Sequence, residues 1–123
     1  MSNNKSITAK TGEDLASEYL DKQGYKLLHR NWRYSRIGEI DIIAQTDNTL
    51  VFVEVKTRTS NHCGDPLESI TATKRNQIFK LAEIYLSENP QTNNITFRFD
   101  AIGIVLRKPP EINHLENAIS FDF

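Results

Sequence analysis

Two adjacent apolar segments, residues 38–45 and 50–56, constrain the fold of this chain more than any other feature. Each has the β-branched, apolar pattern of a buried strand, and each also carries charge. Asp41 lies between isoleucines, and Glu54 and Lys56 alternate with valines. Burying an ionised group without a partner costs several kcal/mol. A specific partner is therefore required, and a metal ion is the leading candidate.

The turn between these segments determines which side chains face each other. If Asp47 and Asn48 form a two-residue hairpin loop, Asp41 opposes Glu54 on the neighbouring strand. Side chains alternate between faces, so Lys56 shares that face. Directly opposed residues have Cβ atoms about 4.5–5.5 Å apart, where like charges repel. A three-residue loop would shift the register and move Asp41 off this face, so the predicted carboxylate pair depends on the loop length.

The length of 123 residues suits one domain with a moderate core. We expect a single domain over residues 1–123, with residues 1–7 flexible. No apolar run approaches the roughly 18 residues of a membrane span, and the N-terminus lacks an apolar signal core. We therefore expect a cytoplasmic protein without a membrane partner. The single Cys63 excludes an intramolecular disulfide.

The net charge of −1 argues against nucleic-acid binding, but the charges are unevenly distributed. Between Lys22 and Lys80 there are ten Lys or Arg residues and six Asp or Glu residues. The acidic surplus lies at the two ends of the chain. Charge alone thus leaves open both an ordinary solvated surface and a basic binding face.

The order of the predicted elements is helix, three strands, helix, strand. A helix between the third and fourth strands allows a right-handed crossover and parallel pairing of those two. The sequence therefore predicts an α/β fold with a central mixed sheet of about four to five strands flanked by helices. The expected elements are a helix over 8–23, a strand over 25–30, a basic aromatic connection over 31–37, strands over 38–45 and 50–56, a loop over 57–69, a helix from Thr71 or Thr73 to about 87, a strand over 95–106, and a short helix or strand after 112.

Two opposed carboxylates beside a lysine suit a hard divalent cation. Mg²⁺, or Mn²⁺, takes one or two carboxylates together with water and phosphate oxygens. Asp41 and Glu54 would be these ligands, and the backbone carbonyl of Val55 could add another. Lys56 could orient or deprotonate a water, or stabilise charge on phosphoryl oxygens. The structural alternative is an ion pair of Lys56 with Asp41 or Glu54 on an edge strand.

Several motifs together resemble the YraN-like family of uncharacterised bacterial proteins, over a region from about Gly12 to the C-terminus. That family is similar to the restriction-endonuclease-like (PD-(D/E)XK) superfamily, and within it to archaeal Holliday-junction resolvases. The motifs are Gly-Glu at 12–13, Gly-Glu-Ile-Asp at 38–41, Phe-Val-Glu-Val-Lys at 52–56, Lys74, and Arg-Phe-Asp at 98–100.

The resemblance implies a Mg²⁺-dependent phosphodiesterase core with Asp41, Glu54 and Lys56 at the catalytic positions. Glu13 matches in order and location a glutamate that the resolvases carry on their first helix. Without the resemblance, the simpler interpretation of Glu13 is an acidic residue in the first turn of the helix, where the helix dipole favours a negative charge.

Candidate nucleic-acid contacts lie around these residues. Lys74 and Arg58 could contact phosphates, although a solvated lysine is the alternative for Lys74. Arg33 and Arg36 interleave with aromatic residues, a pattern that suits backbone contact and base stacking. For Trp32 alone, packing on the core edge is the simpler interpretation.

Three functions remain open at this point. The first is a Mg²⁺-dependent nuclease acting on DNA, including branched or junction DNA. The second is a catalytically silent module on the same fold that binds nucleic acid or protein. The third is a structural interaction protein with a buried ion-pair cluster. Symmetric cleavage of two strands would require a two-fold homodimer.

Overall fold

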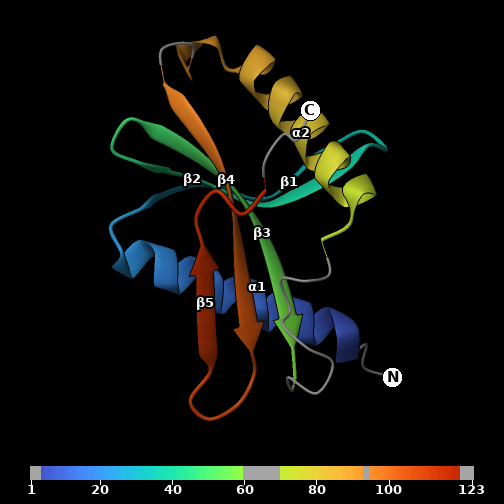
Figure 1. The fold of residues 1–123 in the computed structure, drawn as a ribbon, viewed down its shortest axis with the longest axis vertical. Helices are drawn as coiled ribbons and strands as arrows, with labels where there is room; N and C mark the ends of the chain where they lie inside the picture. Colours follow the sequence, from blue (N-terminus) through green and yellow to red (C-terminus); the bar gives the residue numbers. More distant parts are fainter. Residues whose placement is uncertain (1–3, 60–69, 93–94, 120–123) are drawn as a thin grey trace.

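The computed structural model describes residues 4–59, 70–92 and 95–119, and shows one five-stranded mixed sheet with helices on both faces (Figure 1). The predicted fold class is confirmed, and the architecture is consistent with a restriction-endonuclease-like core. Along the chain the elements are α1 (Asn4–Lys22), β1 (Lys26–Tyr34), β2 (Gly38–Thr46), β3 (Thr49–Arg58), α2 (Ala72–Glu88), the short 3₁₀ helix η2 (Pro90–Thr92), β4 (Thr96–Val105) and β5 (Glu111–Leu115).

The strands lie in the sheet in chain order, and only one pair of neighbours is parallel. β3 pairs with β4 in parallel, while the other three pairs are antiparallel. Parallel neighbours need a crossover connection, and α2 lies in that connection. The predicted parallel pairing across a helix is therefore confirmed.

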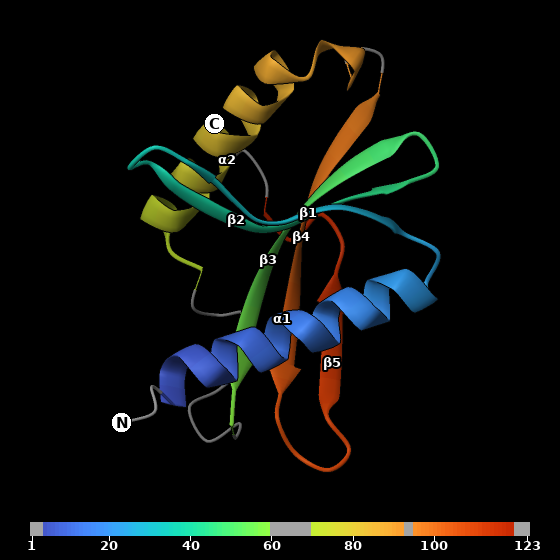
Figure 2. The ribbon, with the colours of Figure 1, turned by 180° about the vertical axis from the view of Figure 1, so that it is seen from behind.

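Alternating residues of the central strands form two separate cores. On one face, Val53 and Ile102 pack with Leu20 of α1. On the other face, Phe52 packs with Leu81 of α2. Figure 2 shows α1 crossing the sheet on the face opposite α2. Glu54 and Lys56 follow Phe52 at intervals of two, which places them on the α2 face.

The hairpin between β2 and β3 has the predicted register. Asp47 has φ 50°, as a tight turn requires, and Thr46 pairs with Thr49. Pairing continues to Ile42 and Val53 and ends there. Beyond that point β2 stays with β1, and β3 stays with β4, so the two strands diverge (Figure 1). We call this divergence, from residue 41 of β2 and residue 54 of β3, the fork.

Some element boundaries differ from the prediction. β1 extends to Tyr34 through most of the predicted connection, because residues 32–34 pair with β2 and Gly38, at φ 141°, permits the tight turn. α1 begins four residues early, at Asn4, since no Gly or Pro interrupts the chain before Gly12. The tail forms a strand, β5. The predicted start of α2 is confirmed, with Thr71 as its N-cap.

Two further predictions concern β3. Arg58 belongs to this strand, so the predicted loop over 57–69 starts later than expected, and its residues 60–69 lie outside the described ranges. β3 pairs with β2 only as far as Val53 and with β4 alone beyond it, so it has one paired neighbour at Lys56. The Glu54–Lys56 ion pair of the structural alternative is present there, with 4.0 Å between the charged atoms.

Gly12 allows α1 to approach β3 closely. A Cβ at this position would lie 1.8 Å from Thr57 Oγ1. We expect Gly12→Ala to lower the free energy of unfolding by about 1–3 kcal/mol through overpacking, although alanine is the better helix former by about 1 kcal/mol. Urea unfolding measures this. Thr57→Ala should partly rescue Gly12→Ala, and a stabilised Gly12→Ala would contradict the close packing.

Candidate active site

Asp41 and Glu54 are the first residues of the fork, and both are buried, with 8 % and 5 % of their surface exposed. Asp41 Oδ2 accepts a hydrogen bond from the backbone N–H of Val55, 2.8 Å away. This carboxylate therefore satisfies a backbone donor at the point where the β2–β3 ladder has ended. The bond holds Asp41 at the fork in a defined position.

Glu54 lies between two lysines from different elements. Its Oε1 is 4.0 Å from Lys56 Nζ on the same strand, and its Oε2 is 3.8 Å from Lys74 Nζ on α2. Oε2 is buried, and no donor in the described ranges forms a hydrogen bond with it. A buried anionic oxygen without a hydrogen bond is unusual, because most buried polar atoms are satisfied. Such an oxygen is a ready ligand for a hard cation.

The two carboxylates raise each other's cost of ionisation. The pKa of Asp41 is raised to about 8, chiefly by burial and then by repulsion from Glu54, with the Val55 N–H opposing. Burial also raises the pKa of Glu54, while Lys74 and Lys56 act to lower it. Without a cation, the pair therefore resists carrying two full negative charges at neutral pH.

Glu13 approaches the same site from α1. Repulsion from its carboxylate raises the pKa of both Asp41 and Glu54. α1 and α2 lie on opposite faces of the sheet, so the divergence of β2 and β3 lets both helices influence one pair of carboxylates. Glu13 Oε1 accepts a hydrogen bond from Asn31 Nδ2 at 2.9 Å. The structure thus brings all four predicted catalytic residues, Glu13, Asp41, Glu54 and Lys56, into one neighbourhood.

The donors at the fork fit Mg²⁺ or Mn²⁺ better than they fit a closed structural site. No group of three or more His, Cys, Asp or Glu side chains stands at ligand spacing within the described part of the chain. Two carboxylates remain, with Val55 adjacent. Mg²⁺ commonly binds through one or two carboxylates and completes its shell with water and phosphate oxygens. The hydrogen-bond-free Glu54 Oε2 is consistent with such a cation.

The predicted nucleic-acid contacts fall into two groups. Lys74 lies at the carboxylates, and the half-buried Arg58 follows Lys56 on the same strand face. Arg33 and Arg36 lie on the β1–β2 hairpin, where Arg33 pairs with Glu39 at 3.0 Å. The Gln77 side chain of α2 donates a hydrogen bond to the carbonyl of Ile37 in the same hairpin.

The aromatic residues of β1 form a short stack. The rings of Trp32 and Tyr34 lie 6.2 Å apart at an interplanar angle of 22°. Trp32 also packs edge-on against Tyr85 of α2, which confirms its predicted packing at the core edge. Tyr34 is 37 % exposed, so the outer ring of the stack is accessible.

Arg98 and Asp100, two residues apart on β4, form an ion pair that organises a region other than the fork. Asp100 is fully buried and also contacts His114 Nε2 at 2.8 Å. His114 in turn contacts the Tyr19 hydroxyl of α1. These two partners of His114 lie 14 and 95 residues away along the chain, so the contacts depend on the tertiary structure. This network connects β4 and β5 to the end of α1.

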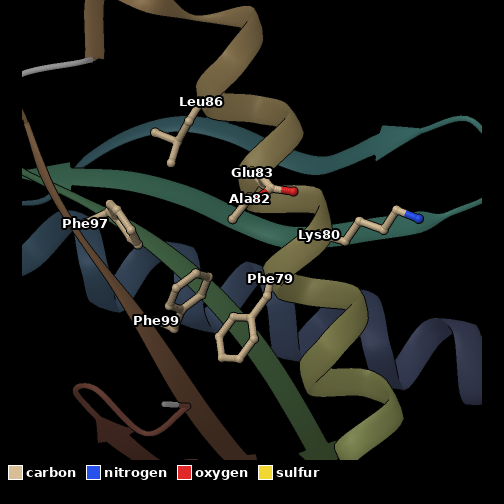
Figure 3. A pocket seen from close by; sticks show the side chains of 7 residues that line it. All are labelled: Phe79, Lys80, Ala82, Glu83, Leu86, Phe97 and Phe99. Atoms are coloured by element: carbon tan, nitrogen blue, oxygen red, sulfur yellow. The ribbon is translucent and has the colours of Figure 1, made fainter. Parts of the chain in front are cut away.

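A cavity of about 570 Å³ lies elsewhere, between α2 and β4 (Figure 3). Its walls are apolar, and the carboxylates of the fork do not line it. The side chains around it include Phe79, Leu86, Phe97 and Phe99, with Lys80 and Glu83 at the rim. Among the described residues, Glu83 is the one carboxylate that lines it, whereas the fork has a buried pair, so the fork is the stronger candidate for an active site.

Sequence reasoning missed Asn31, which it placed in a connection. The structure places it inside β1 with φ 52° and bonded to Glu13. The available signal was weak: Asn is among the residues other than glycine that most readily adopt positive φ.

None of the helices in the described ranges is long and apolar enough to cross a membrane.

The chain is similar over nearly its whole length to bacterial proteins of one family. A UPF0102 protein of Geobacter metallireducens is 46 % identical over 121 residues, which cover 98 % of this chain and 97 % of the relative. One from Sulfurihydrogenibium is 47 % identical over 118 residues (96 % and 98 %), and one from Caldicellulosiruptor saccharolyticus 43 % over 118 residues (94 % and 98 %). A family model described as "Uncharacterised protein family UPF0102" matches residues 12–104. The chain therefore belongs to the UPF0102 family, the YraN-like family that its motifs resemble.

Proposed function

We propose that this protein is a Mg²⁺- or Mn²⁺-dependent nuclease that hydrolyses DNA phosphodiester bonds at the fork. The observation that carries the proposal is the buried pair Asp41 and Glu54. Burial raises the pKa of both, and Glu54 lies between two lysines. Strongly perturbed carboxylates with specific charged neighbours are typical of functional sites. A purely structural cluster would instead pair each charge closely.

Asp41 and Glu54 would hold the cation, with the Val55 carbonyl as a further ligand. A cation bound there would polarise a phosphodiester and lower the pKa of an attacking water. Lys56 would orient that water or stabilise charge on the phosphoryl oxygens. Lys74, near the opposite carboxylate oxygen of Glu54, would contact the phosphate.

The β1–β2 hairpin supplies the proposed path for the nucleic-acid strand. Arg33 and Arg36 would contact backbone phosphates, and Tyr34 would stack on an exposed base. Arg58 would extend this contact along β3. The resemblance to the restriction-endonuclease-like superfamily and to archaeal Holliday-junction resolvases supports DNA as the substrate. It also favours branched DNA and a two-fold homodimer that cuts two strands symmetrically.

A nuclease screen with Mn²⁺ tests the proposal on duplex, flap, single-stranded and four-way DNA. We expect cleavage by the parent protein and a loss of at least about 100-fold in Lys56→Ala and Glu54→Gln. Lys80→Ala is the matched control, because Lys80 is an exposed lysine of α2 away from the fork. It should cleave as the parent does.

A second outcome would identify a binding module. The binding module is favoured if the parent protein binds these DNA substrates in a gel-shift assay but cleaves none of them. The Glu54→Gln variant should then bind as the parent does. The observation behind it is that fewer than three acidic or His/Cys ligands gather at ligand spacing in the described ranges. Cleavage by the parent and equally by both variants would instead place the active site elsewhere.

A further inference from the structure

An open cavity of about 540 Å³ lies between α1 and β1. Glu13 and Asn31 line it together with Ala9, Lys10 and Arg30. Glu13 thus belongs both to the proposed active site and to the lining of this cavity. The contacts of its side chain determine whether its carboxylate is directed toward the proposed cation site.

Asn31 has an unusual backbone for a residue within a strand. Its φ of 52° lies in the left-handed region, which costs of order 1 kcal/mol or more for a residue other than glycine. The flanking residues keep one register: Arg30 pairs with Ile42 and Trp32 with Ile40. No residue is inserted at Asn31, so its conformation does not serve to change the pairing. Strain of this kind persists where the surroundings require it.

With this backbone conformation, the side chain of Asn31 points toward Glu13. Asn31 Nδ2 donates to Glu13 Oε1 at 2.9 Å, and Arg30 Nη2 lies 3.8 Å from the same oxygen. Arg30 is itself anchored by Asp14, 2.8 Å from its Nη1. The contacts hold one oxygen of Glu13, and no hydrogen bond reaches its second oxygen from the described residues. That second oxygen remains available as a ligand or an acceptor.

The helix that carries Glu13 is also held in place. Gly12 permits contact with Thr57 of β3, one residue beyond Lys56. Glu13 has a side chain only 15 % exposed. Asn31, which binds Glu13, lies between Arg30 and Trp32, whose partners are Ile42 and Ile40, so it stands opposite Asp41 in the β1–β2 ladder.

We propose that Asn31 is a positioning residue that holds the Glu13 carboxylate beside Asp41 and Glu54 to assist binding of the divalent cation. This inference rests on the proposed function, because it assumes a cation at the fork. Groups that orient a metal's ligands typically contribute 10- to 100-fold in affinity. The role assigned to Asn31 is of this kind, with Glu13 acting on the cation through a bound water, because three carboxylates do not stand at ligand spacing in the described ranges.

Calorimetric titration of the whole protein with Mn²⁺ alone tests this role. Asn31→Gly removes the amide and accepts the positive φ without strain, so the variant should fold. We expect it to bind Mn²⁺ about 10-fold more weakly or worse. Asn31→Asp keeps the shape, replaces the donor by a charge that repels Glu13, and should weaken binding at least as much. Asn117→Gly is the matched control, since Asn117 has φ 54° in a turn away from the fork, and its affinity should stay unchanged.

A double variant separates positioning from general destabilisation. If Asn31 acts through Glu13, adding Asn31→Gly to Glu13→Gln should weaken Mn²⁺ binding no further. Independent losses that add would overturn the inference, as would wild-type affinity in both Asn31 variants, and in either case the proposed function would stand. A parent protein without Mn²⁺ affinity would instead overturn the proposed function and this inference together.

Discussion

Replacing Asp41 by asparagine is expected to stabilise the metal-free protein at pH 8, although it alters a buried polar residue. The pKa of Asp41 is raised from 3.8 to about 8 by burial and by Glu54. Stability is therefore full below about pH 4 and is lost as the pH rises through about 8, because the folded state resists ionisation. Asparagine carries no charge and can still accept the hydrogen bond from the Val55 N–H.

The expected size follows from linkage. A difference of one pKa unit corresponds to about 1.4 kcal/mol, so the gain at pH 8 should reach a few kcal/mol. Urea unfolding at pH 5 and pH 8 measures it. The parent should lose stability between these values, and Asp41→Asn should lose less. If Asp41→Asn proves less stable than the parent at pH 8, the carboxylate serves a structural ion pair rather than a cation site.

Mn²⁺ should reduce the difference in stability between Asp41→Asn and the parent. A ligand that binds only the folded state stabilises it by about 2.7 kcal/mol at 100 times its dissociation constant. The parent should gain this amount, whereas Asp41→Asn, which lacks a charged ligand, should gain little. Thermal unfolding with and without Mn²⁺ at pH 8 provides the comparison.

The same substitution at Asp100 should have the opposite effect, a loss of about 3–5 kcal/mol at pH 7. Asp100 is fully buried and accepts two hydrogen bonds from Arg98, at 2.8 and 2.9 Å. It also contacts His114 Nε2 and accepts from the backbone N–H of Asn117. Neutralising it leaves the largely buried Arg98 with only the exposed carboxylate of Glu116, 3.0 Å from its Nη1, as a counter-charge, and breaking a buried pair costs about this much.

The pH dependence at Asp100 also has the opposite sign. Burial alone would raise its pKa, but hydrogen bonds from His114, Arg98 and Asn117 outweigh burial and hold the pKa below 3.8. Its contribution to stability is therefore present above about pH 4 and is lost as the pH falls further. Urea unfolding at pH 7 and an acid titration measure both effects.

An exposed pair provides the control for Asp100. Arg107 and Glu111 form an ion pair in which both side chains are about half exposed. Glu111→Gln should change stability by no more than about 0.5–1 kcal/mol. An equally small effect of Asp100→Asn would show that the network does not stabilise β4 and β5.

The contrast between the two aspartates supports the functional assignment. Both are buried on central strands of one sheet, yet Asp100 is surrounded by donors and a guanidinium, while Asp41 faces other carboxylates. A carboxylate with a full set of partners holds a fold together. One that is buried against like charges gains from a cation.

Much of the site was predictable because it depends on local rules. The two-residue loop at Asp47 and Asn48 was enough to set the register of β2 and β3 as far as Ile42 and Val53, which Asp41 and Glu54 directly adjoin. Ladder pairing in fact ends one residue short of that pair, at Ile42 and Val53. The place where two strands part depends on their other partners, and alternation carries no information about it.

The sequence alone determines the order of the elements, the hairpin register and the presence of charged residues on apolar strands. Each of these follows from periodicity or turn chemistry over a few residues. The three-dimensional arrangement adds the fork, the approach of Glu13 and Lys74 from opposite faces, and the bond from Asn31 to Glu13. These contacts join residues 18 or more positions apart. They are set by how the helices pack on the twisted sheet. This packing joins residues far apart in the chain, so local sequence patterns do not indicate which charges it brings together.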